Sequence, residues 1–330
     1  KGNEKADEIA SQVTELVTGA AGFLGERVAD ALLSEGSPLP VKRLVLADVV
    51  RPRARSDPRA SCRALDLCDS GAAAALLPPG TDALLHLAAV VSGHAEADFE
   101  LGLRVNFDAT RALLEAARAV GPRLRFVFVS TVGVFGGELP PVVGDLTAVT
   151  PQTSYGTAKA MSELLVNEYA RRGFVDARIV RLPTVSVRAG AANRAVTSFA
   201  SDIVREPLGG RRAVCPVPPA QRVWLASPRT VVRNIVHAAT LPAELFGSWR
   251  VVNLPGIRVT VGEMVDALRK VAGESAAALV SFEKDEDVAR MVASFPSQFD
   301  NSRALGLGFT VDDDFKNIIL DYIRNDLKKS

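Results

Sequence analysis

The sequence is poor in cysteine and histidine, and it has no long apolar run. Three cysteines and three histidines occur among 330 residues, and their spacing suits neither a disulfide framework nor a zinc site. No apolar stretch approaches the roughly 20 residues that cross a bilayer. A formal net charge of +1 provides no field that would attract nucleic acid or an anionic membrane. We therefore expect a soluble, cytoplasmic protein with reduced thiols and no bound metal.

Apolar residues, in contrast, are plentiful: 48% of the chain is hydrophobic and 23% is charged, which is enough for a sizeable core. Over the first two-thirds, short apolar runs alternate with segments of helical periodicity, a pattern that predicts βαβ units and a parallel sheet. We predict an α/β fold, a Rossmann-type doubly wound parallel sheet with a smaller mixed α/β C-terminal lobe. Gly, Pro and Arg accumulate between Arg188 and Pro219, where the regular pattern ends.

The expected organisation has two parts. Residues 13–182 are expected to form a dinucleotide-binding Rossmann unit, with a returning segment at about 215–252. Residues 183–214 and 253–330 are expected to form a substrate-binding lobe over the carboxyl ends of the strands, where ligands bind in open α/β sheets. The polar segment 1–12 is expected to be a tag-like or flexible terminus.

A glycine-rich turn, TGAAGFLG at residues 18–25, lies between the first predicted strand and the first predicted helix. Gly19 allows the tight turn, Gly22 lets the backbone approach a pyrophosphate, and Gly25 permits close packing of helix on strand. The helix N-terminus then offers N–H groups to the anion. In this strand–turn–helix context the turn predicts a dinucleotide site.

Asp48 ends the second predicted strand, at the position where a carboxylate accepts hydrogen bonds from the adenosine ribose and repels a 2′-phosphate. Three arginines follow closely and could instead accommodate NADP. We favour NAD, because the carboxylate occupies the ribose position itself. Asp66 and Leu67 follow the next short strand and could bracket the adenine.

Tyr155 and Lys159 stand four residues apart on a predicted helix, so their side chains share one face. A neutral phenol is a poor base, and a neighbouring ammonium favours the phenolate by lowering its pKa. The pair follows both the glycine turn and Ser130-Thr131 at the end of a buried strand. A surface Tyr and Lys can be four apart by chance, but three signals in this order predict a catalytic site.

In these motifs the chain resembles the extended short-chain dehydrogenase/reductase family, often labelled NAD-dependent epimerase/dehydratase. The resemblance runs from Leu16 to about Asp321 and includes a late element, DNSRALG, at residues 300–306. It implies NAD as the cofactor and a homodimer formed through the two helices that flank the site. The expected cofactor-binding residues are Gly19, Gly22, Phe23, Leu24, Gly25, Asp48, Asp66, Leu67, Leu87, Ala88, Ala89, Asn106, Tyr155, Lys159 and Pro183.

The resemblance also implies catalytic roles. Tyr155 would be the general acid/base. Lys159 would lower the pKa of Tyr155 and hold the nicotinamide ribose. Thr131, with Ser130 as the nearby substitute, would hydrogen-bond the reacting oxygen.

Departures from the family patterns narrow the reaction. Val132 and Gly133 stand where the dehydratases carry Asp-Glu, so dehydration is disfavoured. The segment RLPTVSV at residues 181–187 lacks the Asn, Tyr and Gly of the nucleotide-sugar enzymes. Through residues 181–208 the chain instead resembles a branch that oxidises the four-carbon sugar acid D-erythronate at C2 with NAD.

We therefore predict oxidation of a small sugar acid at its C2 hydroxyl, with D-erythronate giving 2-dehydro-D-erythronate. A carboxylate in a partly desolvated site needs a cation, and a guanidinium can engage both oxygens. Arg188 is the first candidate and Arg194 the second. The residues expected to contact the substrate are Thr131, Tyr155, Arg188, Asn193, which could bond its hydroxyls, and Ser92.

Two alternatives remain at this stage. The first is a nucleotide-sugar 4-epimerase that holds NAD tightly without net redox. The second is a protein that binds or senses NAD without catalysis, which would need neither Tyr155 nor Lys159.

Overall fold

The computed structural model describes residues 13–193 and 195–327. The expectations for residues 1–12 and for Arg194 therefore lie outside the described residues. Within the described ranges, no helix combines the length and the apolar character that a membrane crossing requires.

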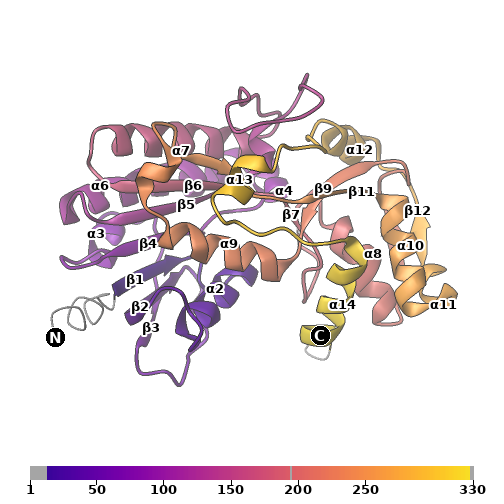
Figure 1. Cartoon of the computed structure of the whole chain (residues 1–330), viewed down its shortest axis with the longest axis horizontal. Helices are drawn as coiled ribbons and strands as arrows, with labels where there is room; N and C mark the ends of the chain where they lie inside the picture. The colour runs from indigo at the N-terminus through magenta and orange to yellow at the C-terminus, as the bar shows by residue number, and fades with distance from the viewer. Residues whose placement is uncertain (1–12, 194, 328–330) are drawn as a thin grey trace.

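Seven parallel strands form the central sheet, in the order β10-β6-β5-β4-β1-β2-β3 (Figure 1). The strands are β1 (Val13–Thr18), β2 (Val41–Asp48), β3 (Ala60–Ala64), β4 (Ala83–His86), β5 (Arg125–Thr131), β6 (Asp176–Leu182) and β10 (Val251–Asn253). The chain order reverses between β1 and β4, and open α/β sheets bind ligands in the crevice at such a reversal.

Each face of this sheet is covered by helices, which is why its strands read as continuous apolar runs. Val17 and Leu46 pack on one face, whereas their chain neighbours Leu16 and Val45 pack on the other. The first face carries α2 (Phe23–Leu33) and α9 (Pro228–Thr240), and the second carries α3 (Ala72–Leu76), α6 (Ala109–Val120) and α7 (Ser154–Arg171) (Figure 1).

Short helical segments complete this unit. They are α4 (Ser92–Ala97), α5 (Phe99–Leu103), the π-helical η1 (Arg104–Asp108) and the 3-10 segments η2 (Val132–Val134) and η3 (Ala243–Phe246). The first three of these segments follow β4, and η2 follows β5, so they lie at the carboxyl edge of the sheet.

The remaining elements form a lobe with an apolar core of its own, at one end of the sheet (Figure 1). Its strand β9 (Arg222–Ala226) pairs with β7 (Thr184–Val185) and β11 (Ile257–Thr260), and β8 (Ala213–Cys215) pairs with β12 (Val280–Phe282). The helices of the C-terminal half are α8 (Phe199–Leu208), α10 (Val261–Ala272), α11 (Glu274–Ala277), α12 (Glu286–Ala293), α13 (Ser302–Gly306) and α14 (Phe315–Asn325).

The chain returns from the lobe to the sheet later than the sequence analysis placed it. Cys215 and Val223 pack in the lobe core, so the return begins with α9 and not at about residue 215. Ala304 and Phe309, which we assigned to the lobe, pack in the core beneath the sheet. The first difference arises because β8 and β9 pair with strands far away in sequence.

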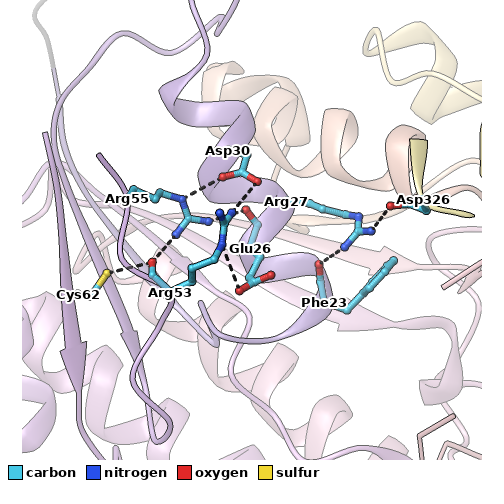
Figure 2. Close-up of polar contacts among 8 residues, drawn as sticks. All are labelled: Phe23, Glu26, Arg27, Asp30, Arg53, Arg55, Cys62 and Asp326. Atoms are coloured by element: carbon cyan, nitrogen blue, oxygen red, sulfur yellow. Dashed lines mark hydrogen bonds and ion pairs between the residues drawn. The ribbon is translucent and has the colours of Figure 1, made fainter. Parts of the chain in front are cut away.

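The C-terminal end is tied back to the dinucleotide turn. Arg27 on α2 pairs with Asp326 at 2.6 Å and donates to the carbonyl of Phe23 at 3.2 Å (Figure 2). The end of α14 thereby contacts the first turn of α2.

Candidate active site

The glycine turn is as tight as its sequence predicts. Gly19 has φ +70°, and a Cβ on Gly25 would lie 2.0 Å from the carbonyl oxygen of Gly19. A Cβ on Gly19 would lie 2.7 Å from the backbone nitrogen of Ala88, so the turn also contacts the segment after β4. Only glycine fits at these two positions. The turn therefore packs directly against α2 and the segment after β4, the close approach that a pyrophosphate-binding turn requires.

A buried histidine fixes the turn to the sheet. His86 Nδ1 lies 2.7 Å from Thr18 Oγ1, and His86 Nε2 lies 2.9 Å from Thr110 Oγ1. Thr18 Oγ1 also accepts from the N–H of Ala88 at 3.3 Å. Burial lowers the pKa of His86 to about 3, so the ring stays neutral and joins these segments without adding charge.

Asp48 lies beside the turn at the end of β2. Its carboxylate accepts from the N–H of Ala21 at 3.0 Å and from that of Val49 at 2.7 Å. Two backbone bonds orient the carboxylate at the edge where a ribose would lie, so this residue and the turn together fit a dinucleotide.

The first turn of α7 places Tyr155 against η2. Thr153 caps this helix, with its Oγ1 accepting from the N–H of Gly156 at 3.0 Å. A Cβ on Gly156 would lie 2.2 Å from the carbonyl oxygen of Gly133, so the two backbones touch. A Cβ on Gly133 would contact both Thr131 Oγ1, at 3.3 Å, and Tyr155 Cδ1, at 4.0 Å. Thr131 and Tyr155 are therefore neighbours.

Lys159 lies one turn further along α7 and is buried. Its Nζ donates to the carbonyl of Val129 at 2.9 Å and lies 5.9 Å from the centre of the Tyr155 ring. Burial lowers the pKa of Lys159 to about 8, against the opposing effect of the Glu163 carboxylate. An ammonium has three donors, so this group keeps N–H bonds for a ligand.

Arg188 supplies a positive charge that acts on Tyr155. Burial raises the pKa of Tyr155 to about 12, and the Arg188 guanidinium opposes this rise. That Lys159 also lowers this pKa, as the resemblance implies, stays a prediction. The Arg188 guanidinium also lies 5.6 Å from the centre of the Phe23 ring, at the start of α2. It therefore stands between the phenol and the dinucleotide turn.

These groups surround one cavity of about 470 Å³ at the carboxyl edge of the sheet. The predicted residues that line it are Gly19, Gly22, Phe23, Leu24, Gly25, Leu87, Ala89, Ser92, Ser130, Thr131, Tyr155, Lys159, Pro183, Arg188 and Asn193. Polar and apolar groups from both parts of the molecule thus meet in one place.

A model of the NAD dependent epimerase/dehydratase family matches residues 15–239. The chain belongs to this family. D-Erythronate dehydrogenases from Haemophilus influenzae and Cupriavidus necator are each 49% identical to it; the matches cover 94% of this chain and 99% and 98% of those proteins. The crystal structure of the nucleoside-diphosphate-sugar epimerase from Agrobacterium tumefaciens has 42% identity and a TM-score of 0.91, over 97% of this chain and 96% of that one. The predicted family and Rossmann-type fold are confirmed.

Ser130 lines the cavity, but its hydroxyl is engaged by another side chain. Its Oγ donates to Glu163 Oε1 at 2.5 Å, and Glu163 forms a buried ion pair with Arg181 at 2.6 Å. The hydroxyl of Ser130 thus belongs to a charged network beneath α7. Thr131 is the hydroxyl of this pair that neighbours Tyr155.

Several predicted residues lie away from the cavity. Asn106 is buried and bonds the backbone of Val90 through both ends of its amide, at 2.9 and 3.0 Å. It shapes the segment after β4 and does not line the cavity. Asp66 is exposed, and neither it nor Leu67 lines the cavity; their contact with an adenine stays a prediction.

The cavity also has walls that the sequence analysis missed. They come from β9 and from the segment after α12, and include Arg222, Trp224, Phe295 and Pro296. No motif marks these residues. The pairing of β9 with β7 places Arg222 and Trp224 in the wall of the cavity.

Proposed function

We propose that this family member oxidises D-erythronate at its C2 hydroxyl with NAD, giving 2-dehydro-D-erythronate. The observation that carries the proposal is that the Arg188 side chain and the Tyr155 phenol line one cavity, with the guanidinium lowering the pKa of the phenol. In a 2-hydroxy acid the reacting hydroxyl is one carbon from the carboxylate, so a base and a cation must be neighbours. The two dehydrogenases that share 49% of their residues with this chain support the choice of acid.

Tyr155, ionised, would take the proton of the C2 hydroxyl, while Thr131 Oγ1 would hydrogen-bond the same oxygen. Arg188 would hold the carboxylate, with Asn193 and Ser92 next to the rest of the carbon chain. Lys159 would bond the ribose nearest the reaction. Holding the reacting groups at contact distance supplies much of the rate of such a transfer.

The cofactor groups fit the residues at the turn. The backbone N–H groups of Phe23 and Leu24, in the first turn of α2, would bind the pyrophosphate, and Asp48 would accept from the adenosine ribose. NAD, when bound, supplies the ring carbon that accepts the hydride.

The decisive experiment measures NADH formation by the purified chain with single acids. D-Erythronate should give the highest kcat/KM, with its epimers at C2 and C3 and L-threonine well below it. UDP-glucose and UDP-galactose serve as the arm for epimerisation, the activity named for the Agrobacterium structure. Sugar-nucleotide interconversion without net NADH, and no NADH from any C3 to C6 sugar acid, would replace the proposal by the epimerase alternative.

We further propose a homodimer, working in the cytoplasm, where NAD is abundant and thiols stay reduced. Phe99 on α5 and Leu164 on α7 are 58% and 56% exposed on neighbouring helices, and large apolar side chains of this exposure favour a contact surface. Sedimentation of the parent and of Leu164→Glu tests the assembly. A parent that sediments as a monomer would contradict it.

A further inference from the structure

Arg53 and Arg55, in the loop after β2, lie against helix α2 and face two of its carboxylates, Glu26 and Asp30. Arg55 Nε donates to Asp30 Oδ1 at 3.0 Å, and Arg53 lies 3.5 Å from Asp30 Oδ2 and 3.9 Å from Glu26 Oε1 (Figure 2). The two arginines follow Asp48 by five and seven residues. In a Rossmann fold, arginines in this part of the chain accept the 2′-phosphate of NADP. Their charges are therefore matched within the protein.

Each of the three Arg55 nitrogens already donates a hydrogen bond within the protein. Besides the bond to Asp30, its Nη1 donates to the carbonyl of Arg53 at 3.2 Å and its Nη2 to the carbonyl of Glu26 at 3.0 Å. Its side chain is only 6% exposed. Arg55 thus holds the loop onto α2.

Arg53 is different, because its side chain is 59% exposed and its two ion-pair distances are long. An exposed pair of this kind contributes little to stability, so the arginine can leave it. Two carboxylates nevertheless surround the guanidinium, and their field lowers its attraction for a second anion.

We propose that Glu26 and Asp30 are specificity-determining residues for the cofactor: by neutralising Arg53 they disfavour NADP independently of Asp48. The inference rests on the proposed dinucleotide site and goes beyond it. Asp48 repels a 2′-phosphate from the ribose side, and the α2 carboxylates neutralise Arg53, one of the cations that could bind it. Removing Asp48 alone should therefore be insufficient to admit NADP.

Binding measured without turnover tests this. Dissociation constants for NADH and NADPH are obtained by nucleotide fluorescence on the full chain and on Asp48→Asn, Asp30→Asn and the double variant. Asp30→Asn alone should leave the NADH dissociation constant within about twofold. The double variant should bind NADPH at least about tenfold more tightly than Asp48→Asn, because Arg53 is then less fully neutralised and can pair with the 2′-phosphate. Glu26→Gln in place of Asp30→Asn should act in the same direction.

The matched control is Asp48→Asn with Asp287→Asn, since Asp287 also pairs with an arginine on a helix surface, 81% exposed and in the lobe. It removes the same charge and should gain no NADPH affinity over Asp48→Asn. Arg53→Gln in the double variant should abolish the gain. If the parent binds NADH but the double variant binds NADPH no better than Asp48→Asn or than the control, the inference is wrong while the proposed function stands. If the parent binds neither nucleotide, both are wrong.

Discussion

At Tyr155 the ring and the hydroxyl have different expected roles: the ring lines the cavity, and the hydroxyl oxygen would take the proton. In Tyr155→Phe the ring that forms the cavity wall stays, and the group that takes the proton is lost. General acid–base groups contribute roughly 10²–10⁴-fold to rate, so kcat should fall by that factor. The NADH dissociation constant should stay within a few-fold. Steady-state kinetics with D-erythronate and a nucleotide titration check the two halves, and a Phe variant with parental kcat would remove Tyr155 from the proposed mechanism.

Arg188 should affect both substrate binding and the pH dependence of the rate. Tyr155 acts as a base only when ionised, so activity is present above its pKa and is lost as the pH falls through that pKa. The guanidinium lowers this pKa, so Arg188→Met should move the rising limb of kcat/KM to higher pH. The loss of the carboxylate's partner should in addition cost about 2–5 kcal/mol in kcat/KM.

Arg188→Lys is the control, because it keeps the charge but not the paired donors. It should keep most of the parental pH profile and lose part of the affinity. A pH profile unchanged in Arg188→Met would show that another cation acts on the phenol.

Sequence alone could place some of these residues and not others. The spacing of Tyr155 and Lys159 fixes a shared helix face, and the structure places both side chains in the cavity wall. That Arg188 also acts on the phenol depends on a loop 33 residues further along the chain. The hydrogen-bond partner of Ser130 is likewise distant in sequence, because it is Glu163 on α7. No local sequence pattern predicts such a contact.

At the scale of elements, helix α8 holds the loop that carries Arg188. Ser201 Oγ accepts from the N–H of Arg188 at 3.0 Å, and Arg205 Nη1 donates to its carbonyl at 3.0 Å. Arg205 is buried and paired with Asp202 and with Glu206. The backbone of Arg188 is thus fixed on both sides by one helix, which makes Ser201 and Arg205 positioning residues.

Ser201→Ala removes one of these two bonds and should raise the KM for D-erythronate roughly three- to tenfold, as expected for a lost hydrogen bond of about 1 kcal/mol. The NADH dissociation constant and kcat should change little, since Tyr155 is held by α7. Ser294→Ala, which loses a hydroxyl bonded to Met291 at 2.7 Å in the same lobe, is the control. Equal KM increases in both variants would indicate general loosening of the lobe.

The elements of the lobe also mark the limit of prediction from sequence. Strands β7, β8 and β12 have two or three residues each, too few for a period of two to be recognised. Their existence depends on partners such as β12 for β8, which lies more than 60 residues away. The longer strands and helices around the glycine turn could be predicted, because each has a recognisable pattern of apolar residues within its own sequence.

At the scale of the whole molecule, one buried carboxyl group, that of Glu15, affects stability. Glu15 lies on β1, the strand between β2 and β4, and its carboxylate oxygens have no hydrogen-bond partner within the described residues. Burial raises the pKa of Glu15 to about 8, partly opposed by Arg125 and reinforced by Asp82. The folded protein therefore holds a proton on this carboxyl at pH values where the unfolded chain has released it.

This proton makes stability fall as the pH rises. The pKa of this carboxyl is about 8 in the folded protein and about 4.3 in the unfolded chain. Its contribution to stability is fully present below about pH 4.3. It is lost as the pH rises towards about 8, at about 1.4 kcal/mol per pH unit. His86, with its pKa lowered to about 3, acts in the opposite direction, but only below about pH 6.5. Lys159, with a pKa of about 8, titrates at and above the upper end. Between pH 6.5 and 8 the slope therefore belongs mainly to Glu15.

We expect the parent to lose about 2 kcal/mol of unfolding free energy between pH 6.5 and 8, measured by urea titration at constant ionic strength. Glu15→Gln has a similar shape and no proton to release, so its unfolding free energy should stay nearly constant over this range. Glu283→Gln, an exposed carboxylate on the lobe, should keep the parental slope. A parental curve that is flat between pH 6.5 and 8 would mean that Glu15 is ionised in the folded state, with Arg125 outweighing the effect of burial.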